Sequence, residues 1–186
     1  LYHIFVALTM SLTWVEISKE ALGGNMRQFR RLVGDEVILA PAVKANAYGH
    51  GLVEASKIFL ESGADWLCVN ALYEAEVLRE AGVQSPIYIF GYVELSELER
   101  AVDLDCRLIV YNRETVAELG RIGKAVKVHV KVETGNNRQG VLIEELVEFG
   151  RYIGEFENIE LEGLTTHFAN IEDTTDHSYD FKQLER

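Results

Sequence analysis

Short apolar segments alternate with longer amphipathic segments along most of this chain, and this alternation limits its fold more than any other feature. Strands are predicted over residues 37–43, 66–69, 87–90, 107–111, 126–132 and 159–168. Helices are predicted over residues 18–33, 52–62, 71–81, 95–102, 114–122 and 143–153, with a last one from about residue 178. Six strand–helix units of about 20–30 residues are typical of a parallel α/β sheet.

Two architectures fit this alternation, a doubly wound open sheet and a (β/α)8 barrel of the TIM type. A typical barrel needs eight units and about 250 residues. With 186 residues and six units, this chain would supply an incomplete barrel. The alternation alone does not choose between the two architectures.

Side-chain alternation within the predicted strands favours a polar interior. In the strand 126–132 the valines lie on one face, and Lys127, His129 and Lys131 lie on the other. Both faces of a strand in a βα series are usually covered, so this polar face should line a barrel interior or a cleft, where its charges need partners. The same alternation puts two further sets on one face each, Ile38, Ala40, Ala42 and Lys44 in the first strand and Leu161, Gly163, Thr165 and His167 in the sixth.

Charge and cysteine usage exclude some classes of protein. The net charge of −12 argues against a nucleic-acid binder, which needs a basic face to neutralise phosphates. Cys68 and Cys106 are far apart in apolar segments and are expected to be reduced core residues of a cytoplasmic protein. The histidines lack the short spacing of a metal site, so no metal is expected. The apolar run 4–8 is too short to cross a membrane, and no membrane partner is expected.

The amino terminus does not begin with methionine. The chain starts at Leu1, and its first methionine is Met10. We expect the native start to be Met10, with residues 1–9 as upstream sequence. Residues 14–17 are predicted to form a short strand.

Lys44 ends the first predicted strand, at the point where the backbone turns into a loop of small residues. Burial would lower its pKa and make its amine a base or a Schiff-base nucleophile. On position alone, a strand-end lysine that reaches solvent is the more common case. In the same way His167 could be a structural histidine, and residues 133–140 could be a polar turn.

Taken together, four segments resemble the alanine racemase family. They are Trp-Val-Glu-Ile at 14–17, Ala-Val-Lys-Ala-Asn-Ala-Tyr-Gly-His-Gly at 42–51, His-Val-Lys-Val-Glu-Thr-Gly-Asn-Asn-Arg-Gln-Gly at 129–140, and Thr-His-Phe-Ala at 166–169. The second segment is similar to the family's pyridoxal-phosphate lysine motif. The resemblance extends from Met10 to the end of the chain.

This resemblance implies pyridoxal 5'-phosphate as cofactor and a role for each matching residue. Lys44 would hold the cofactor covalently and then act as one of two acid/bases at the substrate Cα. Tyr48 would bind the cofactor phosphate, and His167 would pack near the pyridine ring. Arg138 would donate to the cofactor's phenolic oxygen, help to place the substrate carboxylate, and depress the pKa of Lys44. Lys131 matches a lysine that is carbamylated in many members, which would orient Arg138.

The implied activity is interconversion of L- and D-alanine by two-base proton transfer, which supplies D-alanine for peptidoglycan. The family pattern further implies a homodimer in which the partner subunit contributes the second base, a tyrosine. Where this chain has Glu133, Asn136 and Gln139, the family more often has Asp, Met and Leu. These differences leave open whether alanine, serine or a broader set of amino acids is the substrate.

The family barrel has eight units and is followed by a β-rich C-terminal domain. Residues 18–186 would therefore be a partial barrel, and residues 10–17 a strand that normally pairs with that C-terminal domain. With one base on one face of the substrate, the chain alone is expected to have little or no activity. The alternatives are a non-catalytic protein of pyridoxal-phosphate binding or homeostasis, and a structural α/β domain.

Overall fold

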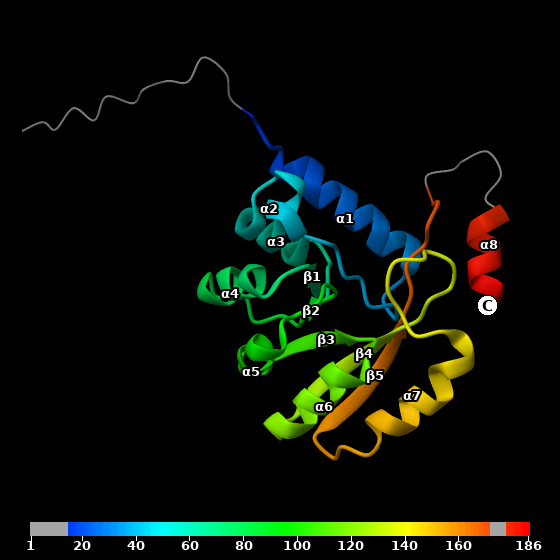
Figure 1. Ribbon diagram of the computed structural model, residues 1–186. Helices are drawn as coiled ribbons and strands as arrows, with labels where there is room; N and C mark the ends of the chain where they lie inside the picture. Colours follow the sequence, from blue (N-terminus) through cyan, green and yellow to red (C-terminus); the bar gives the residue numbers. More distant parts are fainter. Residues whose placement is uncertain (1–14, 172–177) are drawn as a thin grey trace, which may run out of the picture.

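The computed structural model describes residues 15–171 and 178–186 and shows strands surrounded by helices (Figure 1). The strands are β1 Leu67–Val69, β2 Ile87–Ile89, β3 Cys106–Val110, β4 Val126–Lys131 and β5 Ile159–Thr165. The helices are α1 Lys19–Val33, α2 Lys44–Tyr48, α3 Leu52–Glu61, α4 Leu72–Glu80, α5 Leu98–Asp103, α6 Arg113–Ile122, α7 Leu146–Ile153 and α8 Ser178–Glu185. Two 3₁₀ turns, η1 Leu95–Glu97 and η2 Ile143–Glu145, lead into α5 and α7.

Side chains set where several helices begin. The hydroxyl of Ser18 accepts the amide of Ala21 at 3.1 Å and so caps α1. The side-chain oxygen of Asn112 accepts the amide of Thr115 at 2.8 Å at the start of α6. The predicted helices are confirmed, with ends that differ by one residue in most cases. The first three residues of the helices predicted at 95–102 and 143–153 are the 3₁₀ turns η1 and η2.

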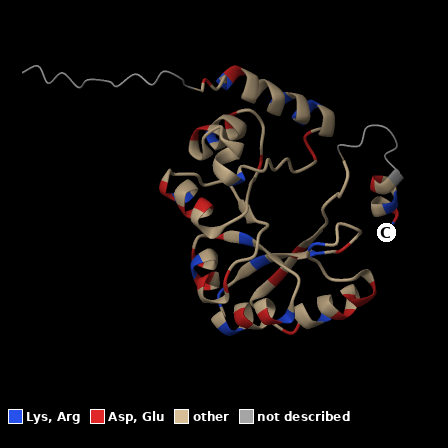
Figure 2. Ribbon diagram, turned by 45° about the horizontal axis from the view of Figure 1, so that its top comes forward, with Lys and Arg blue, Asp and Glu red and all other residues tan. Residues whose placement is uncertain are grey.

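The five strands are parallel and lie in the sheet in the order of the sequence, from β1 to β5. A doubly wound sheet reverses its strand order at a switch point, and this sheet has no such reversal among the described residues. The helices lie on the outside of the curved sheet (Figure 2). The fold is therefore a partial barrel of the TIM (β/α) type.

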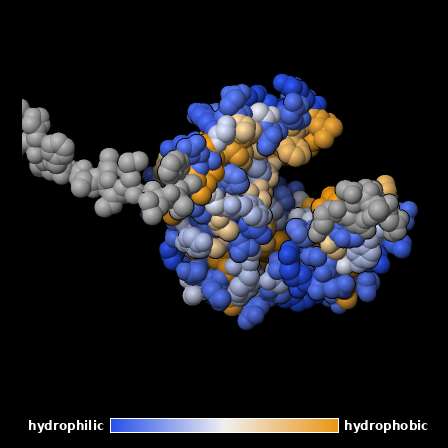
Figure 3. Space-filling model, turned by 90° about the horizontal axis from the view of Figure 1, so that it is seen from above, coloured by the Kyte–Doolittle hydropathy of each residue, from blue (hydrophilic) through white to orange (hydrophobic). Residues whose placement is uncertain are grey.

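The core lies between the strands and the outer helices. Strand residues that point outward, such as Leu67, Ile87, Leu108 and Val128, are at most 1% exposed. On one side of the molecule a wide opening separates the end of α1 from the α8 side (Figure 3). Phe29 and Leu32 near the end of α1 are 56% and 81% exposed.

The first predicted strand, residues 37–43, is wrong as a regular strand. A single bridge joins Ala42 to Cys68, supported by the amide of Cys68 donating to the oxygen of Pro41 at 2.9 Å and by that of Val43 donating to the oxygen of Cys68 at 2.8 Å. Pro41 has no amide hydrogen to donate. No described strand pairs with the segment on its other side, so it stays extended without a second ladder.

The predicted strand at residues 14–17 is also wrong where it can be compared. Residues 15–17 have no regular secondary structure and no described strand beside them, and Val15 is 82% exposed. A strand without a partner leaves its backbone groups to water. Trp14, the expected native start at Met10 and the expected upstream residues 1–9 lie outside the described residues.

A bulge in β5 changes which of its side chains face the interior. Val128 pairs with Leu161, and the next residue, His129, pairs with Gly163, so Glu162 is the extra residue. Gly163 and Thr165 face inward as predicted. Leu161 does not, because it shares the outward direction of Val128, and Glu162 faces the interior in its place.

Glu162 joins the inward basic residues of β3 and β4 in a polar cluster. Its carboxylate accepts from Lys127 Nζ at 2.8 Å, from His129 Nε2 at 3.0 Å and from Arg107 Nε at 3.2 Å. The Arg107 guanidinium carbon lies 4.7 Å from the ring centroid of Trp66. Burial alone would raise the pKa of Glu162, but these partners lower it from 4.5 to about 2. Lys127 and His129 on the polar face of β4 thus have a carboxylate partner inside the barrel, as the alternation of β4 predicts, whereas Lys131 on the same face lies at the other end of the strand, near Arg138.

Gly91, just after β2, allows the ends of β1 and β2 to approach closely. A Cβ at this position would lie 2.0 Å from the backbone oxygen of Asn70. We therefore expect Gly91→Ala to lower the free energy of unfolding by about 3 kcal/mol, measured by urea denaturation. Gly150→Ala in α7, where nothing lies within 4 Å of the added atom, is the control and should be neutral or stabilising. A Gly91→Ala variant as stable as this control would contradict the argument.

Candidate active site

Lys44 lies at the carboxyl end of the extended segment, and its side chain lines a cavity of about 240 Å³. The Lys44 Nζ is 5.0 Å from the ring centroid of Phe90 and 6.0 Å from that of Tyr48. The cavity is lined by Ala40, Ala42, Lys44, Tyr48, Cys68, Tyr88, Phe90, Ile109, Lys131, Arg138, Thr165, Thr166 and His167. The structure therefore brings the five residues of the predicted site together around one cavity.

The segment after Lys44 is a left-handed turn, which the sequence did not reveal. Residues 45–48 all have φ between 51° and 56°, a conformation that costs an L-residue about 1–2 kcal/mol. Asn46 helps to hold it: its backbone oxygen accepts the amides of Gly49 and Gly51, both at 3.0 Å. Its side-chain oxygen accepts the amide of Leu52 at 2.9 Å and so caps α3. The turn directs the chain from the end of the extended segment into α3.

Basic groups converge on the cavity from the Lys44 turn, the end of β4, the loop after β4 and the segment after β5. Lys131, at the end of β4, is 5% exposed. Burial and the nearby charge of Arg138 hold its pKa below the ordinary value, with Glu133 opposing them. Burial also lowers the pKa of His167, and the charges of Arg138, Lys131 and Lys44 lower it further. Such a cavity favours an anionic ligand and keeps the imidazole of His167 neutral at neutral pH.

Glu133 organises the loop that carries Arg138. Its carboxylate accepts the backbone amides of Gly135 and Arg138. Burial would raise the pKa of Glu133, but the amides of this loop hold it below its ordinary value. An ionised Glu133 therefore shapes the backbone from which the Arg138 side chain extends.

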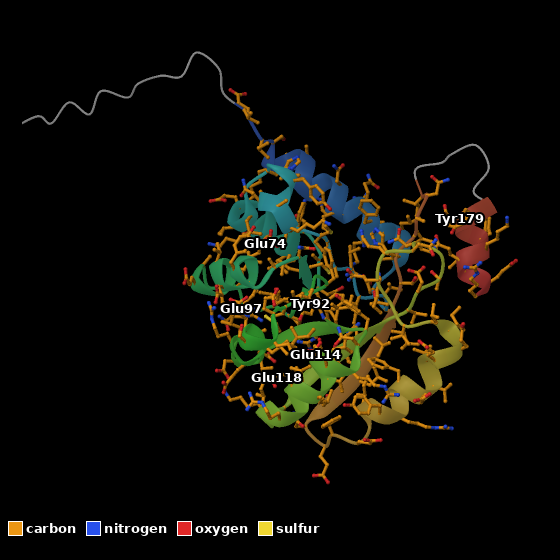
Figure 4. All side chains as sticks on the ribbon, viewed as in Figure 1. Glu74, Tyr92, Glu97, Glu114, Glu118 and Tyr179 are labelled. Atoms are coloured by element: carbon orange, nitrogen blue, oxygen red, sulfur yellow. The ribbon has the colours of Figure 1, made fainter. Side chains whose placement is uncertain are left out.

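Helix α8 fixes the end of β5 next to the site. Gln183 donates to Thr134 Oγ1 at 2.9 Å and to the backbone oxygen of His167 at 3.1 Å. The hydroxyl of Tyr179 donates to the backbone oxygen of Gly135 at 2.6 Å (Figure 4). The residues on α8 were not singled out from the sequence, because nothing in an amphipathic segment indicates which loop it packs against.

Tyr88 is a further residue near the site that was not identified from the sequence. It lies on β2, is 8% exposed and lines the cavity. Its hydroxyl has no hydrogen-bond partner among the described residues. Burial raises its pKa well above the usual range. A tyrosine at an inward position of a predicted strand is the signal that could have identified it.

The other titratable groups near the site are less reactive. Burial raises the pKa of Cys68 to about 12, so its thiol is not a nucleophile at neutral pH. Both cysteines are free.

The described residues contain no group of three or more side chains that could hold a metal ion. Within them no helix has both the length and the apolar character required to span a membrane.

The chain is similar to known alanine racemases in sequence and in structure. The family described as "Alanine racemase, N-terminal domain" matches residues 17–186. Alanine racemase of Methanococcus maripaludis is 44% identical over 178 residues, which cover 93% of this chain and 48% of that protein. The enzyme of Desulfovibrio desulfuricans is 39% identical, with coverages of 93% and 47%.

Solved structures agree with the sequence comparison. An alanine racemase of Clostridium difficile superposes with a TM-score of 0.89 at 32% identity, covering 96% of this chain and 47% of that one. That of Bacillus anthracis superposes with a TM-score of 0.86 at 36% identity, covering 93% and 46%. The chain thus spans about half the length of the relatives it matches. It belongs to the alanine racemase family.

Proposed function

We propose that this chain is the N-terminal part of a pyridoxal-phosphate-dependent alanine racemase, in which Lys44 holds the cofactor and serves as one of two acid/bases. The observation that carries the proposal is the position of Lys44, at the rim of a cavity that also receives Lys131, Arg138 and His167. A primary amine within a set of basic groups suits a phosphorylated aldehyde. Membership of the alanine racemase family supports alanine as the proposed substrate.

The residues present fit this cofactor. The small side chains of Ala40 and Ala42 leave space at the base of the cavity, and the buried Tyr88 hydroxyl lacks a partner among the described residues. A flat, polar, anionic group would occupy that space and meet the basic side chains. When bound, pyridoxal phosphate supplies an electron sink that makes the substrate Cα proton acidic.

Each side chain then has a defined task. Lys44 takes or returns the Cα proton on one face of the substrate. Tyr48, which is 64% exposed, would donate its hydroxyl to the cofactor phosphate. Arg138 would donate to the cofactor's phenolic oxygen and attract the substrate carboxylate. Burial and the charges of its basic neighbours lower the pKa of His167, which favours a neutral imidazole that would pack beside the ring.

Lys131 is proposed as a carbamylation site. Its pKa is lowered by burial and by Arg138, which raises the fraction of neutral amine. This amine attacks the carbon of CO₂ and loses a proton to solvent, leaving a carbamate. Modification would replace two neighbouring positive charges, of which that of Lys131 is buried, with an anion–cation pair that orients Arg138.

The remaining parts of the proposal concern the whole protein. We place the second acid/base, a tyrosine, on the partner subunit of a homodimer, and we expect this chain alone to racemise alanine slowly or not at all. The D-alanine would serve peptidoglycan synthesis in the cytoplasm. Glu133 and Asn136, beside Arg138, leave serine or a broader set of amino acids as the alternative substrate.

Cofactor titration tests the central assignment. Pyridoxal phosphate added to the purified chain should produce a visible absorption band, because a cofactor joined to a lysine absorbs there. Reduction with borohydride followed by peptide mapping should locate the modification on Lys44. Attachment to a different lysine, or no band at all, would refute the proposal.

A further inference from the structure

A buried carboxylate without a role in the proposed chemistry lies behind the Lys44 turn. Glu74, the third residue of α4, is 2% exposed and lies between α4 and the α2–α3 segment (Figure 4). Its Oε1 accepts the amide of Ala45 at 2.6 Å. Its Oε2 accepts the amides of Asn70 at 2.8 Å and Ala71 at 3.1 Å. Both oxygens are thus occupied by backbone amides.

The contacts of Glu74 with Asn70 and Ala71 serve a different purpose from its contact with Ala45. Asn70 and Ala71 immediately precede α4, so their contacts are the local capping that an acidic residue in the first turn commonly provides. Ala45 is 29 residues away in sequence and directly follows Lys44. Capping of α4 does not require this contact.

The Ala45 amide lies directly next to Lys44 in the backbone. It belongs to the peptide unit that joins Lys44 to Ala45, and this unit is planar and rigid. Fixing its N–H direction fixes the backbone of Lys44, from which the amine extends into the cavity. The turn that begins at Ala45, with φ of 52°, is intrinsically unfavourable and needs an external restraint.

We propose that Glu74 is a positioning residue for Lys44: the Glu74 carboxylate accepts the Ala45 amide and so aims the lysine amine into the cavity. A carboxylate suits this position because it accepts at both oxygens, whereas a glutamine would present an NH₂ group to at least one amide donor. An aspartate would keep the charge but lacks the methylene needed to reach Ala45. The role in catalysis rests on the proposed function, but the positioning itself is tested without cofactor.

Three variants of the cofactor-free chain separate positioning from stability. Glu74→Asp should retain the capping of α4 and lose the contact with Ala45, and Glu74→Gln should weaken both. Asn112→Ala removes the capping oxygen of α6, which lies outside the Lys44 site, and serves as the control for destabilisation. Thermal unfolding of all three variants gives the loss of stability against which the other readouts are compared.

Hydrogen exchange of the Ala45 amide is the first readout. Loss of its buried acceptor should accelerate exchange by about tenfold or more in Glu74→Asp and Glu74→Gln relative to wild type. Asn112→Ala should leave exchange at Ala45 unchanged once global unfolding is subtracted. Unchanged exchange at Ala45 in the Glu74 variants would overturn the proposal.

Lysine reactivity is the second readout, and a purely structural role would not affect it. The rates at which a small amine-reactive acylating reagent modifies Lys44 and the exposed Lys57 of α3 are compared across pH. The Lys44-to-Lys57 ratio should change by about tenfold in the Glu74 variants, as for a misplaced reactive group, and stay constant in Asn112→Ala. A constant ratio in Glu74→Asp would overturn the proposal, whether or not Glu74→Gln folds. Failure of wild type to bind pyridoxal phosphate would instead count against the proposed function alone.

Discussion

Replacing Lys44 with alanine should abolish the visible absorption band that forms when pyridoxal phosphate is added to this chain. The amine of Lys44 is the group that joins the cofactor covalently in the proposed function, and the methyl side chain of alanine cannot form this bond. The fold should survive, because the side chain lies at the rim of a cavity rather than in the core. The measurement is an absorption titration of both proteins with the cofactor, accompanied by circular dichroism to verify folding.

Lys57→Ala is the matched control for this experiment. Lys57 is an exposed lysine of α3 outside the cavity, and its removal should leave the band at full intensity. A band that persists in folded Lys44→Ala would show that another amine binds the cofactor. The assignment of Lys44 would then fail.

Replacing Glu162 with glutamine should cost about 3 kcal/mol of unfolding free energy at neutral pH. Glu162 is the only acidic side chain that bonds all three of Arg107, Lys127 and His129 among the described residues. Glutamine has the same shape but no charge, so Arg107 and Lys127 keep their charges with less compensation. Chemical denaturation at pH 7 measures the difference.

The contribution of Glu162 to the free energy of unfolding changes with pH in a definite direction. The pKa of Glu162 is lowered on folding from 4.5 to about 2, so the folded state favours the ionised form. Its contribution is complete above about pH 4.5 and is lost as the pH falls toward 2. Wild type should therefore lose its advantage over Glu162→Gln across this interval.

Glu160→Gln provides the comparison at the same strand. Glu160 has a 61% exposed side chain and lies 3.6 Å from Lys127 Nζ, so its removal should cost less than about 1 kcal/mol. Equal losses from Glu160→Gln and Glu162→Gln would mean that the interior position of Glu162 has no energetic importance. The bulge in β5 would then lack the consequence assigned to it here.

Much of the fold follows from local patterns in the sequence. Helix α6 begins at Arg113, one residue before its predicted start, because its cap, Asn112, acts on residues within one turn. The inward face of β4 follows from the alternation of Val128 and Lys127 along one strand. Lys131 and His167 meet at one cavity because they lie at the carboxyl ends of the neighbouring parallel strands β4 and β5, and Lys44 reaches it from the end of the extended segment that bridges to β1.

The predictions that were wrong or missing concern features whose structure depends on distant parts of the chain. Whether residues 37–43 form a regular strand depends on a neighbour on each side, which the segment itself does not encode. The inward position of Glu162 depends on a bulge, since one extra residue reverses the direction of those that precede it. Glu74 has the pattern of an ordinary helix-start acid, and nothing near it in sequence indicates its bond to Ala45.

The left-handed turn after Lys44 also limits which amino acids this segment can accommodate. Valine, isoleucine and threonine fit this backbone poorly because their branched Cβ atoms crowd it, whereas glycine and asparagine adopt it readily. Small residues at Ala45 and Ala47 therefore satisfy the geometry of the main chain before any contact with a ligand is considered. In a library of variants, tolerance at these two positions would follow backbone preference, while tolerance at Lys44 would follow chemistry.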